Sequence, residues 1–181
     1  RILAKEKRHL KHNVEFVFYT LEEPPYFRTE QMGSAVHAKA MLKYKDKIAG
    51  VYILEMIGYF DSRNIQEYPA GLKFFYPAHG NFIGAISNFS SNSLASNYCS
   101  AMKDLNKLDC QRLVAPSFVT GVDFSDHLNY WNAGIPAIMI TDTAFLRNKN
   151  YHTPKDKVET LNLKKMSYVI DGVVQTVMNH K

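Results

Sequence analysis

The sequence has few cysteines, no long apolar run and no dense basic tract, and each absence excludes a class of protein. Its two cysteines, Cys99 and Cys110, can form neither a disulfide framework nor a zinc knuckle. Two buried thiols are the favoured interpretation, and a single disulfide stays open. No stretch reaches the roughly 18 apolar residues of a transmembrane helix. The net charge of +5 is spread along helix-like stretches, chiefly residues 5–11 and 39–47, so no nucleic-acid-binding module is predicted.

What the sequence does contain is the composition of a globular domain. Of its 181 residues, 46% are hydrophobic and 22% are charged, which is ordinary for a folded protein. Eleven Phe and eleven Tyr supply bulk for a core, and there are no repeats or low-complexity tracts. We therefore expect one domain over residues 1–181, or a large part of one. The compartment stays open between secreted, periplasmic and cytoplasmic.

Apolar and polar stretches alternate along the chain as they do in an α/β fold. Strands are expected over residues 14–20, 50–57, 82–87, 112–115 and 136–141. Helices are expected over residues 2–10, 34–45, 91–105, 126–133 and 163–179. The strand over 50–57 is apolar throughout, as in a sheet that is buried on both faces. A long irregular stretch over 58–80 predicts a functional loop.

Two adjacent carboxylates, Glu22 and Glu23, follow the first predicted strand directly. Functional loops of doubly wound sheets begin at such strand ends. Neighbouring carboxylates repel each other unless a cation neutralises them, and a metal ion would give them separate tasks. One would ligate the metal, and the other would accept a proton from metal-bound water. A solvated acidic turn is the alternative explanation of the pair.

Glu55 and His152 could complete a metal site with this pair. Glu55 lies inside an apolar strand, where an unpaired carboxylate costs several kcal/mol, so it needs a partner, either a metal or a Lys or Arg. His152 lies in the segment YHTPKD on a loop after the strand over 136–141. Alone it would be a surface histidine, but with Glu23 and Glu55 it makes an oxygen and imidazole set that suits zinc.

Four motifs, in order, resemble the M28 family of metallopeptidases over essentially the whole chain. They are FVFYTLEE followed by MGSAVHA, then LEMIGY, SDHLNYWNAGIPAIMITD and YHTPKDKVETLN. The family includes bacterial aminopeptidases and, as a divergent branch, glutaminyl cyclases. The resemblance implies a three-layer αβα fold with a mostly parallel or mixed central sheet. It also implies a zinc-dependent exopeptidase of the aminopeptidase type, which acts on a peptide with a free N-terminus.

The resemblance also implies a role for each matching residue. Glu22 corresponds to the general base, and Glu23 and His152 correspond to ligands of one zinc ion. Glu55 corresponds to a ligand of the second zinc, where many members carry Asp. Asp126 and His127 match a motif expected to support the metal ligands or to shape the substrate pocket, and a purely structural role is equally open. Tyr151 is expected to line the pocket or simply to pack.

The chain departs from the family pattern in two further places. The segment PPYFRTEQM lengthens the loop after Glu23 and is expected to shape one wall of the substrate cleft. The family's upstream His and bridging Asp have no counterpart here. The chain is therefore interpreted as the C-terminal part of the catalytic domain, with the N-terminal metal-ligand segment missing. We expect two zinc ions in the complete protein and weak or absent zinc binding by this chain alone.

Two other functions compete with the peptidase interpretation. A glutaminyl cyclase-like acyltransferase would use a single zinc and share the acidic and YHT elements. The sequence favours it less, because Tyr151 stands where cyclases typically carry Trp. The other alternative is an inactive, metal-free interaction module, which the missing upstream ligands favour. The retained pair Glu22 and Glu23 speaks against it, because two strand-end carboxylates without a metal are a liability.

Overall fold

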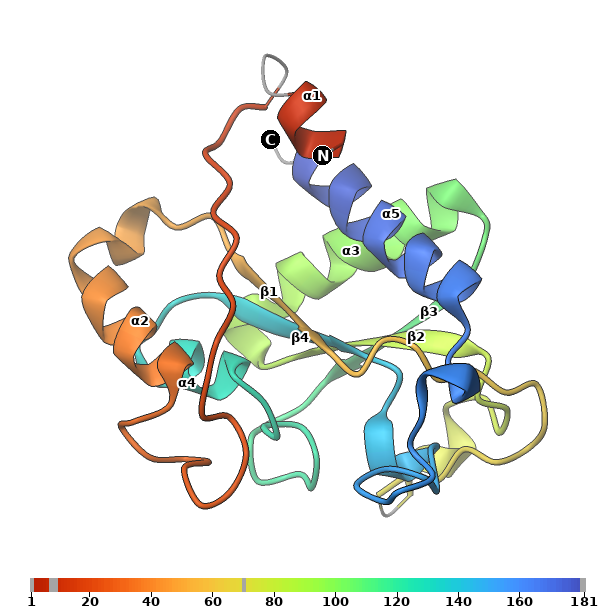
Figure 1. Ribbon diagram of the computed structural model, residues 1–181. Coiled ribbons are helices and arrows are strands. Elements are labelled where there is room, and N and C mark those ends of the chain that lie inside the picture. The colour runs from red at the N-terminus through yellow and green to blue at the C-terminus, as the bar shows by residue number, and fades with distance from the viewer. Residues whose placement is uncertain (1, 7–9, 70, 180–181) are drawn as a thin grey trace.

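The computed structural model describes residues 2–6, 10–69 and 71–179. They form three layers, with a four-stranded sheet between two layers of helices (Figure 1). The strands are β1 (Val51–Glu55), β2 (Phe82–Ser87), β3 (Asp109–Val114) and β4 (Ala137–Thr141). The α-helices are α1 (Ile2–Lys5), α2 (Gly33–Met41), α3 (Asn92–Leu105), α4 (His127–Asn132) and α5 (Leu163–Asn179). The predicted α/β class and αβα layering are confirmed.

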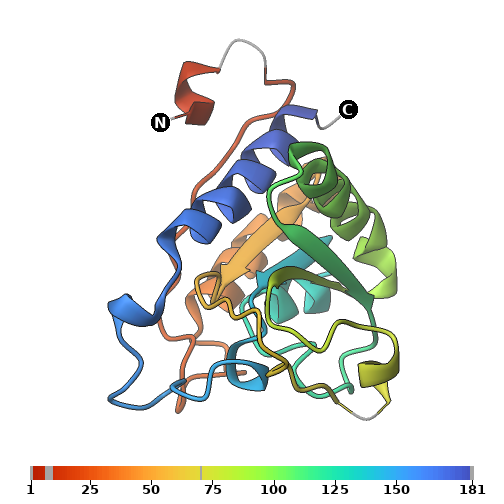
Figure 2. The same cartoon turned by 90° about the vertical axis from the view of Figure 1, so that its right-hand side faces the viewer.

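The sheet is mixed, and its strand order is β1-β4-β2-β3. β1 runs parallel to β4, β2 runs antiparallel to β4, and β3 runs parallel to β2. The C-terminal ends of β1 and β4 therefore meet at one end of the sheet, where Glu55 pairs with Thr141. The loops that follow these two strands gather at that end, together with the loop before α2 (Figures 1 and 2).

Side chains alternate between the two faces of the sheet, and a different pair of helices covers each face. On one face, Ile83 and Ile140 are fully buried against Tyr98 of α3 and Val169 of α5. On the other face, a second cluster packs beside α2 and α4, with Ile53, Ala137, Ala38 and Tyr130 among its members. This arrangement leaves the loop end of the second face free to form a site.

A disulfide joins Cys99 of α3 to Cys110 of β3. The interpretation of these residues as two buried thiols is therefore wrong. The helix ends at Asn106, whose left-handed backbone (φ 50°) lets the chain turn straight back into β3. This turn brings the two Cα atoms to 5.2 Å, within the usual range for a disulfide. Sequence spacing alone did not reveal that reversal.

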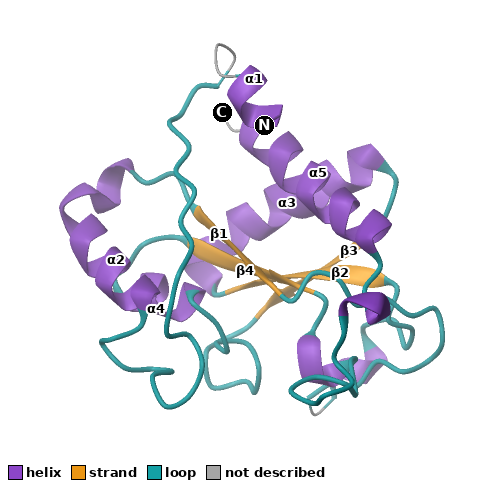
Figure 3. Ribbon diagram, in the orientation of Figure 1, coloured by secondary structure: helices purple, strands orange, loops and turns teal. Residues whose placement is uncertain are grey.

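The expected strand over residues 14–20 is not a strand in the structure. The segment is drawn as loop in Figure 3, and Phe16 and Phe18 are 71% and 92% exposed. Its contacts are made by side chains, since Tyr19 packs against the cluster around α2 and α4 and Glu15 Oε1 lies 3.5 Å from His37 Nε2 of α2. Strand-forming residues make a strand only when a partner satisfies their backbone groups, and no described strand pairs with this segment. Leu54 of the edge strand β1 is also 46% exposed, so β1 is not buried on both faces as predicted.

The other predicted elements are found with small shifts at their ends. β2 and α5 have the predicted limits, and the helix expected over 34–45 is α2 followed by a 3-10 turn at Leu42–Lys47. Of the helix expected over 2–10, α1 covers the start, and residues 7–9 lie outside the described residues. None of the helices in the described part of the chain is both long enough and apolar enough to cross a membrane.

Candidate active site

The loops at the end of the sheet bring Glu23 and His152 into direct contact, although 129 positions separate them. Glu23 Oε1 lies 3.1 Å from His152 Nε2, and both side chains are more than half exposed. The Tyr151 ring stacks on the imidazole, with ring centroids 3.9 Å apart. His152 has a left-handed backbone (φ 56°) in a turn that Thr153 closes on Asn150. Carboxylate, imidazole and ring therefore form one accessible group.

The loop that carries Glu22 and Glu23 is closed at its base by Gly33. The Gly33 amide donates to the Thr20 carbonyl at 2.9 Å. A Cβ at residue 33 would lie 2.9 Å from the Thr20 nitrogen, so only glycine allows this approach. Further in, the amides of Tyr26 and Phe27 both donate to the Glu23 carbonyl. These hydrogen bonds fix the start of the loop, where the two glutamates lie.

Glu22 lies in a strongly acidic environment. Burial raises its pKa to about 7, and the carboxylates of Glu55, Glu23 and Asp126 add to the shift. The neighbouring Tyr151 is affected as well. Burial raises its pKa to about 12, and the carboxylates of Glu23, Glu55 and Glu22 add to the rise. Such a group of carboxylates favours a bound cation, which would return them to their ionised form.

Glu55 projects from the C-terminal end of β1 toward this acidic group. Its Oε2 accepts a hydrogen bond from Ser125 Oγ at 2.8 Å. Burial raises the Glu55 pKa, and the Ser125 hydrogen bond opposes that rise. Within residues 2–6, 10–69 and 71–179, Glu55 forms no ion pair with a Lys or Arg, so the alternative of a structural ion pair is not supported. Ser125, which sequence reasoning missed, is the residue just before the Asp126–His127 pair.

Asp126 and His127, which are adjacent in sequence, have different surroundings. Asp126 accepts a hydrogen bond from Ser34 Oγ at the start of α2, and its charge reaches both Glu22 and Glu55. His127 is fully buried, and its Nε2 donates to the Val122 carbonyl at 2.7 Å. Burial lowers the His127 pKa to about 4. The geometry thus groups Asp126 with the acidic residues and places His127 in the core.

Asp142 is a second residue that sequence reasoning missed. Almost fully buried at the end of β4, it accepts hydrogen bonds from the backbone amides of Gly58, Tyr59 and Ala144 at 2.7–3.0 Å. These bonds tie the loop after β1 to the loop after β4. Burial raises the Asp142 pKa to about 6. The only available signal was an acidic residue at the end of an apolar strand, as at Glu55.

Imidazole and carboxylate donors suit zinc, but the described residues do not group enough of them to hold it. In this part of the chain, no three His, Cys, Asp or Glu side chains lie close enough together to hold a metal ion. Glu23 and His152 form a direct pair, whereas a catalytic zinc normally takes three protein ligands. The donor set therefore fits the chemistry of zinc and is short of its usual ligand number.

Comparison with known proteins identifies the family. The family profile described as Peptidase family M28 matches residues 1–177. The chain belongs to peptidase family M28. This M28 chain is 45% identical over 173 residues to "Uncharacterized protein YfbL" of Escherichia coli (strain K12), a match that covers 94% of the chain and 53% of YfbL. It therefore spans about half the length of this curated relative.

Two solved structures of aminopeptidases share the fold. The Legionella pneumophila LapA aminopeptidase matches with a TM-score of 0.59 at 17% identity, over 82% of this chain and 36% of its own. BSAP, a zinc aminopeptidase from Bacillus subtilis, matches with a TM-score of 0.53 at 15% identity, over 80% of this chain and 31% of its own. At these identities the likeness shows the fold alone.

Proposed function

We propose that this M28 chain carries part of the active site of a zinc-dependent exopeptidase of the aminopeptidase type, which hydrolyses the first peptide bond of its substrate. The M28 profile supports a peptidase role. The observation that carries the finer proposal is the contact between Glu23 and His152 beside the acidic group formed by Glu22, Glu55 and Asp126. Acidic residues at this position would also attract the positively charged amino end of a peptide.

In this proposal each acidic residue has its own task. Glu22 takes the proton from the attacking water and passes it to the departing amine, which is general base and then general acid catalysis. Glu23 and His152 would hold one zinc ion and Glu55 a second, with the remaining ligands coming from outside the described residues. Zinc, when bound, would make water more acidic and polarise the peptide carbonyl. Ser125 would position Glu55 through its hydrogen bond.

The test replaces Glu22 by Gln in the protein at its natural length, with zinc supplied. Loss of a positioned acid and base should lower kcat for a peptide anilide by about 10²- to 10⁴-fold, with zinc content unchanged. Glu30→Gln, an exposed change in the same loop, serves as the control and should leave kcat unaltered. Full turnover by the Glu22→Gln protein would refute the assignment.

The same preparation tests the two competing functions. The substrate for this test is a peptide whose first residue is Gln. Cyclisation of that Gln with release of ammonia, instead of its removal by hydrolysis, would favour the cyclase-like acyltransferase. The metal-free interaction module draws its support from the absence of three grouped ligands in the described residues. Metal analysis of the purified natural protein decides this point, because a peptidase of this type must contain zinc.

A further inference from the structure

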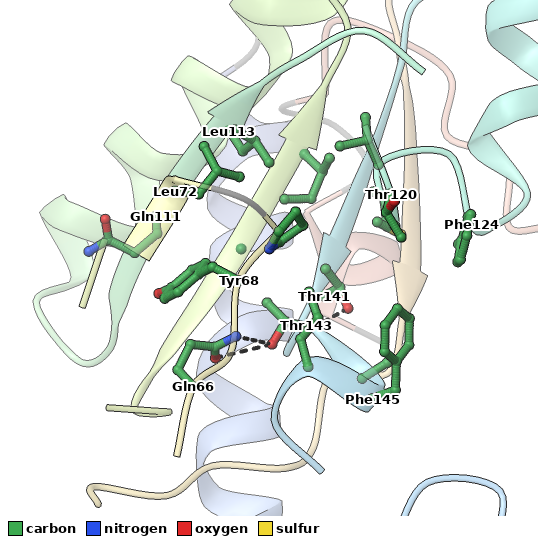
Figure 4. A pocket seen from close by; sticks show the side chains of 18 of the residues that line it. Gln66, Tyr68, Leu72, Gln111, Leu113, Thr120, Phe124, Thr141, Thr143 and Phe145 are labelled. Carbon is green, nitrogen blue, oxygen red and sulfur yellow. Dashed lines mark hydrogen bonds between the residues drawn. The ribbon is translucent and has the colours of Figure 1, made fainter. Parts of the chain in front are cut away.

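A polar hollow of about 640 Å³ lies between the C-terminal half of α3, the edge strand β3 and the start of α5 (Figure 2). The two disulfide-bonded residues, Cys99 and Cys110, both line it, and each is partly exposed. Gln111 of β3 borders this hollow and also the apolar cavity that Figure 4 shows on the opposite face of the sheet. The hollow beside the disulfide has the size of a small-molecule site, about 300–1,000 Å³.

The charged side chains around the disulfide are mainly basic. Four of them are cationic and line the hollow: Lys103, Lys107, Arg112 and Lys165. Among the described residues of the lining, Asp109 is the single acidic one, so four positive charges less one negative charge leave a net charge of +3. A cleft lined with charges of one sign raises the local concentration of ligands of the opposite sign. The hollow therefore favours an anionic ligand.

Two of the four cations already have partners, and the other two are available to a ligand. Lys107 Nζ lies 3.1 Å from Asp171 Oδ2, and Lys165 Nζ donates to the side chain of the asparagine just before β2. In the part of the chain that the structure describes, neither Lys103 nor Arg112 forms an ion pair. Both residues are exposed. An incoming carboxylate could thus bind them without displacing another group.

Each of these two available cations lies on the same face of its element as one of the two cysteines. Lys103 follows Cys99 by four residues on α3, and residues four apart are neighbours on a helix surface. Arg112 follows Cys110 by two residues on β3, and alternate residues of a strand point to the same side. A neighbouring cation stabilises a thiolate, and a stabilised thiolate leaves a disulfide faster. Either sulfur of the bond is therefore provided with a cation.

We propose that this hollow is a thiol–disulfide exchange site for a small thiol that carries carboxylate groups. Lys103 and Arg112 would hold the carboxylates, and the thiolate of the bound ligand would attack the disulfide beside them. Reactive cysteines typically lie in partly exposed, electropositive surroundings, whereas deeply buried ones are inert. The inference does not rest on the proposed peptidase function, because no candidate active-site residue lines the hollow.

The exchange consists of two displacements. The thiolate of the first ligand attacks one sulfur of the Cys99–Cys110 bond, so that a mixed disulfide forms and the other cysteine leaves as a thiolate. The thiolate of a second ligand attacks the ligand sulfur of the mixed disulfide, which releases the ligand's own disulfide and the second cysteine. The protons of the two ligand thiols pass to the two cysteines. Two ligand thiols are thus oxidised, and the protein disulfide is reduced by two electrons.

The test compares two thiols of different charge, 3-mercaptopropionate and 2-mercaptoethanol, as reductants of the folded protein at its natural length. Differential alkylation and peptide mapping follow the state of Cys99 and Cys110. Each rate constant is divided by that for bis(2-hydroxyethyl) disulfide, an uncharged reference, because thiols differ in intrinsic reactivity. The corrected rate constant should be about tenfold higher for the anionic thiol at low salt, and high salt should abolish the difference.

Two results of this comparison would overturn the inference. One is a corrected ratio of one or less at low salt, because the basic lining would then give the anionic thiol no advantage. The other is a rate that does not change with thiol concentration, because the disulfide would then react only after the protein unfolds. A ratio that is high at low salt and falls with added salt supports the exchange site.

Paired variants separate the hollow from the net charge of +5 on the chain. Lys103→Gln together with Arg112→Gln should lower the corrected ratio by about fivefold. Lys39→Gln together with Lys45→Gln removes the same charge on and just after α2, at the other face of the sheet, and should leave the ratio within about twofold. All four positions are exposed, so both proteins should fold. Equal losses in the two proteins would mean that net charge alone attracts the thiol, and the site assignment would fail.

Discussion

The α3 and α5 side of this sheet and its loop end differ in the residues that build them. Under α3 and α5 the interior is apolar and closed, with Ile83, Ile138 and Val169 fully buried. At the loop end, carboxylates are partly buried close to one another, and their pKa values rise as a result. Non-glycine residues with a left-handed backbone also gather in the loops at this end: Leu21, Met56, Thr143, Ala144 and His152. The apolar side stabilises the fold. The partly buried carboxylates and the left-handed residues of the loop end destabilise it, which is typical of functional sites.

The largest expected effect comes from breaking the closed side. Ile138→Ala would leave a cavity where β4 meets α3, and should lower the free energy of unfolding by about 2–5 kcal/mol. Leu163→Ala, at a 63% exposed position, should cost less than about 1 kcal/mol. Chemical denaturation of both variants measures the difference. Equal losses would mean that the α3 and α5 face does not hold the fold together.

His127 makes the core sensitive to acid. Burial lowers its pKa from 6.5 to about 4. Between these two pH values the imidazole is protonated in the unfolded state and neutral in the folded state. Stability should therefore decline as the pH falls from 6.5 to 4, by on the order of 3 kcal/mol from this residue. His127→Gln, which can still donate to the Val122 carbonyl, should lack this component.

The difference in the free energy of unfolding between wild type and His127→Gln, followed over pH, separates the contribution of His127 from that of other titrating groups. Asp142, whose pKa is raised to about 6, stabilises the folded state as the pH falls over much of the same range and so masks part of the effect. Denaturation curves at several pH values give the difference directly. Parallel curves for the two proteins would refute the assignment.

The disulfide is expected to contribute slightly less to the closed side. Cys99 and Cys110 are 11 residues apart, and opening so short a loop should cost about 2–3 kcal/mol. Cys99→Ser together with Cys110→Ser tests this by thermal unfolding. Ser100→Ala, an exposed change on the same helix, should leave the midpoint unchanged. A double variant as stable as wild type would show that α3 holds β3 without the bond.

The smallest expected effect lies at the acidic end and has the opposite sign. Removal of one repelling carboxylate by Glu22→Gln should stabilise the metal-free protein by about 1 kcal/mol near pH 8, after allowance for solvent screening. The gain should shrink as the pH falls below 7, because Glu22 is then already neutral in the folded state. Destabilisation at pH 8 would contradict the contrast between the two sides.

The sequence predicted the elements that a local residue pattern determines. It missed the features that depend on contact with a distant segment of the same chain. The ends of β2 and α5 could be predicted, because the hydrophobic periodicity stops there at residues that disfavour its continuation. The strand expected over 14–20 has the right residues, but no pattern says whether a neighbouring strand is present. The disulfide was missed for the same reason, since it depends on how α3 and β3 lie in space.

The candidate site was predicted unevenly. Family motifs, not spacing, pointed to Glu23 and His152, which lie in contact. The hydrogen bond from Ser125 to Glu55 joins residues 70 positions apart, and no local signal announces it. Each of these depends on long-range geometry, which a single sequence does not encode in a readable form.

The disulfide has a practical consequence for anyone preparing the protein. Cys110 lies on β3, the last strand in the order β1-β4-β2-β3, so the bond to α3 helps to hold this outer strand in place. Cytosolic expression keeps thiols reduced, whereas export or oxidative refolding closes the bond. Two laboratories could thus purify the same polypeptide with and without the bond and measure different stabilities. A count of free thiols in each batch should accompany every comparison of stability.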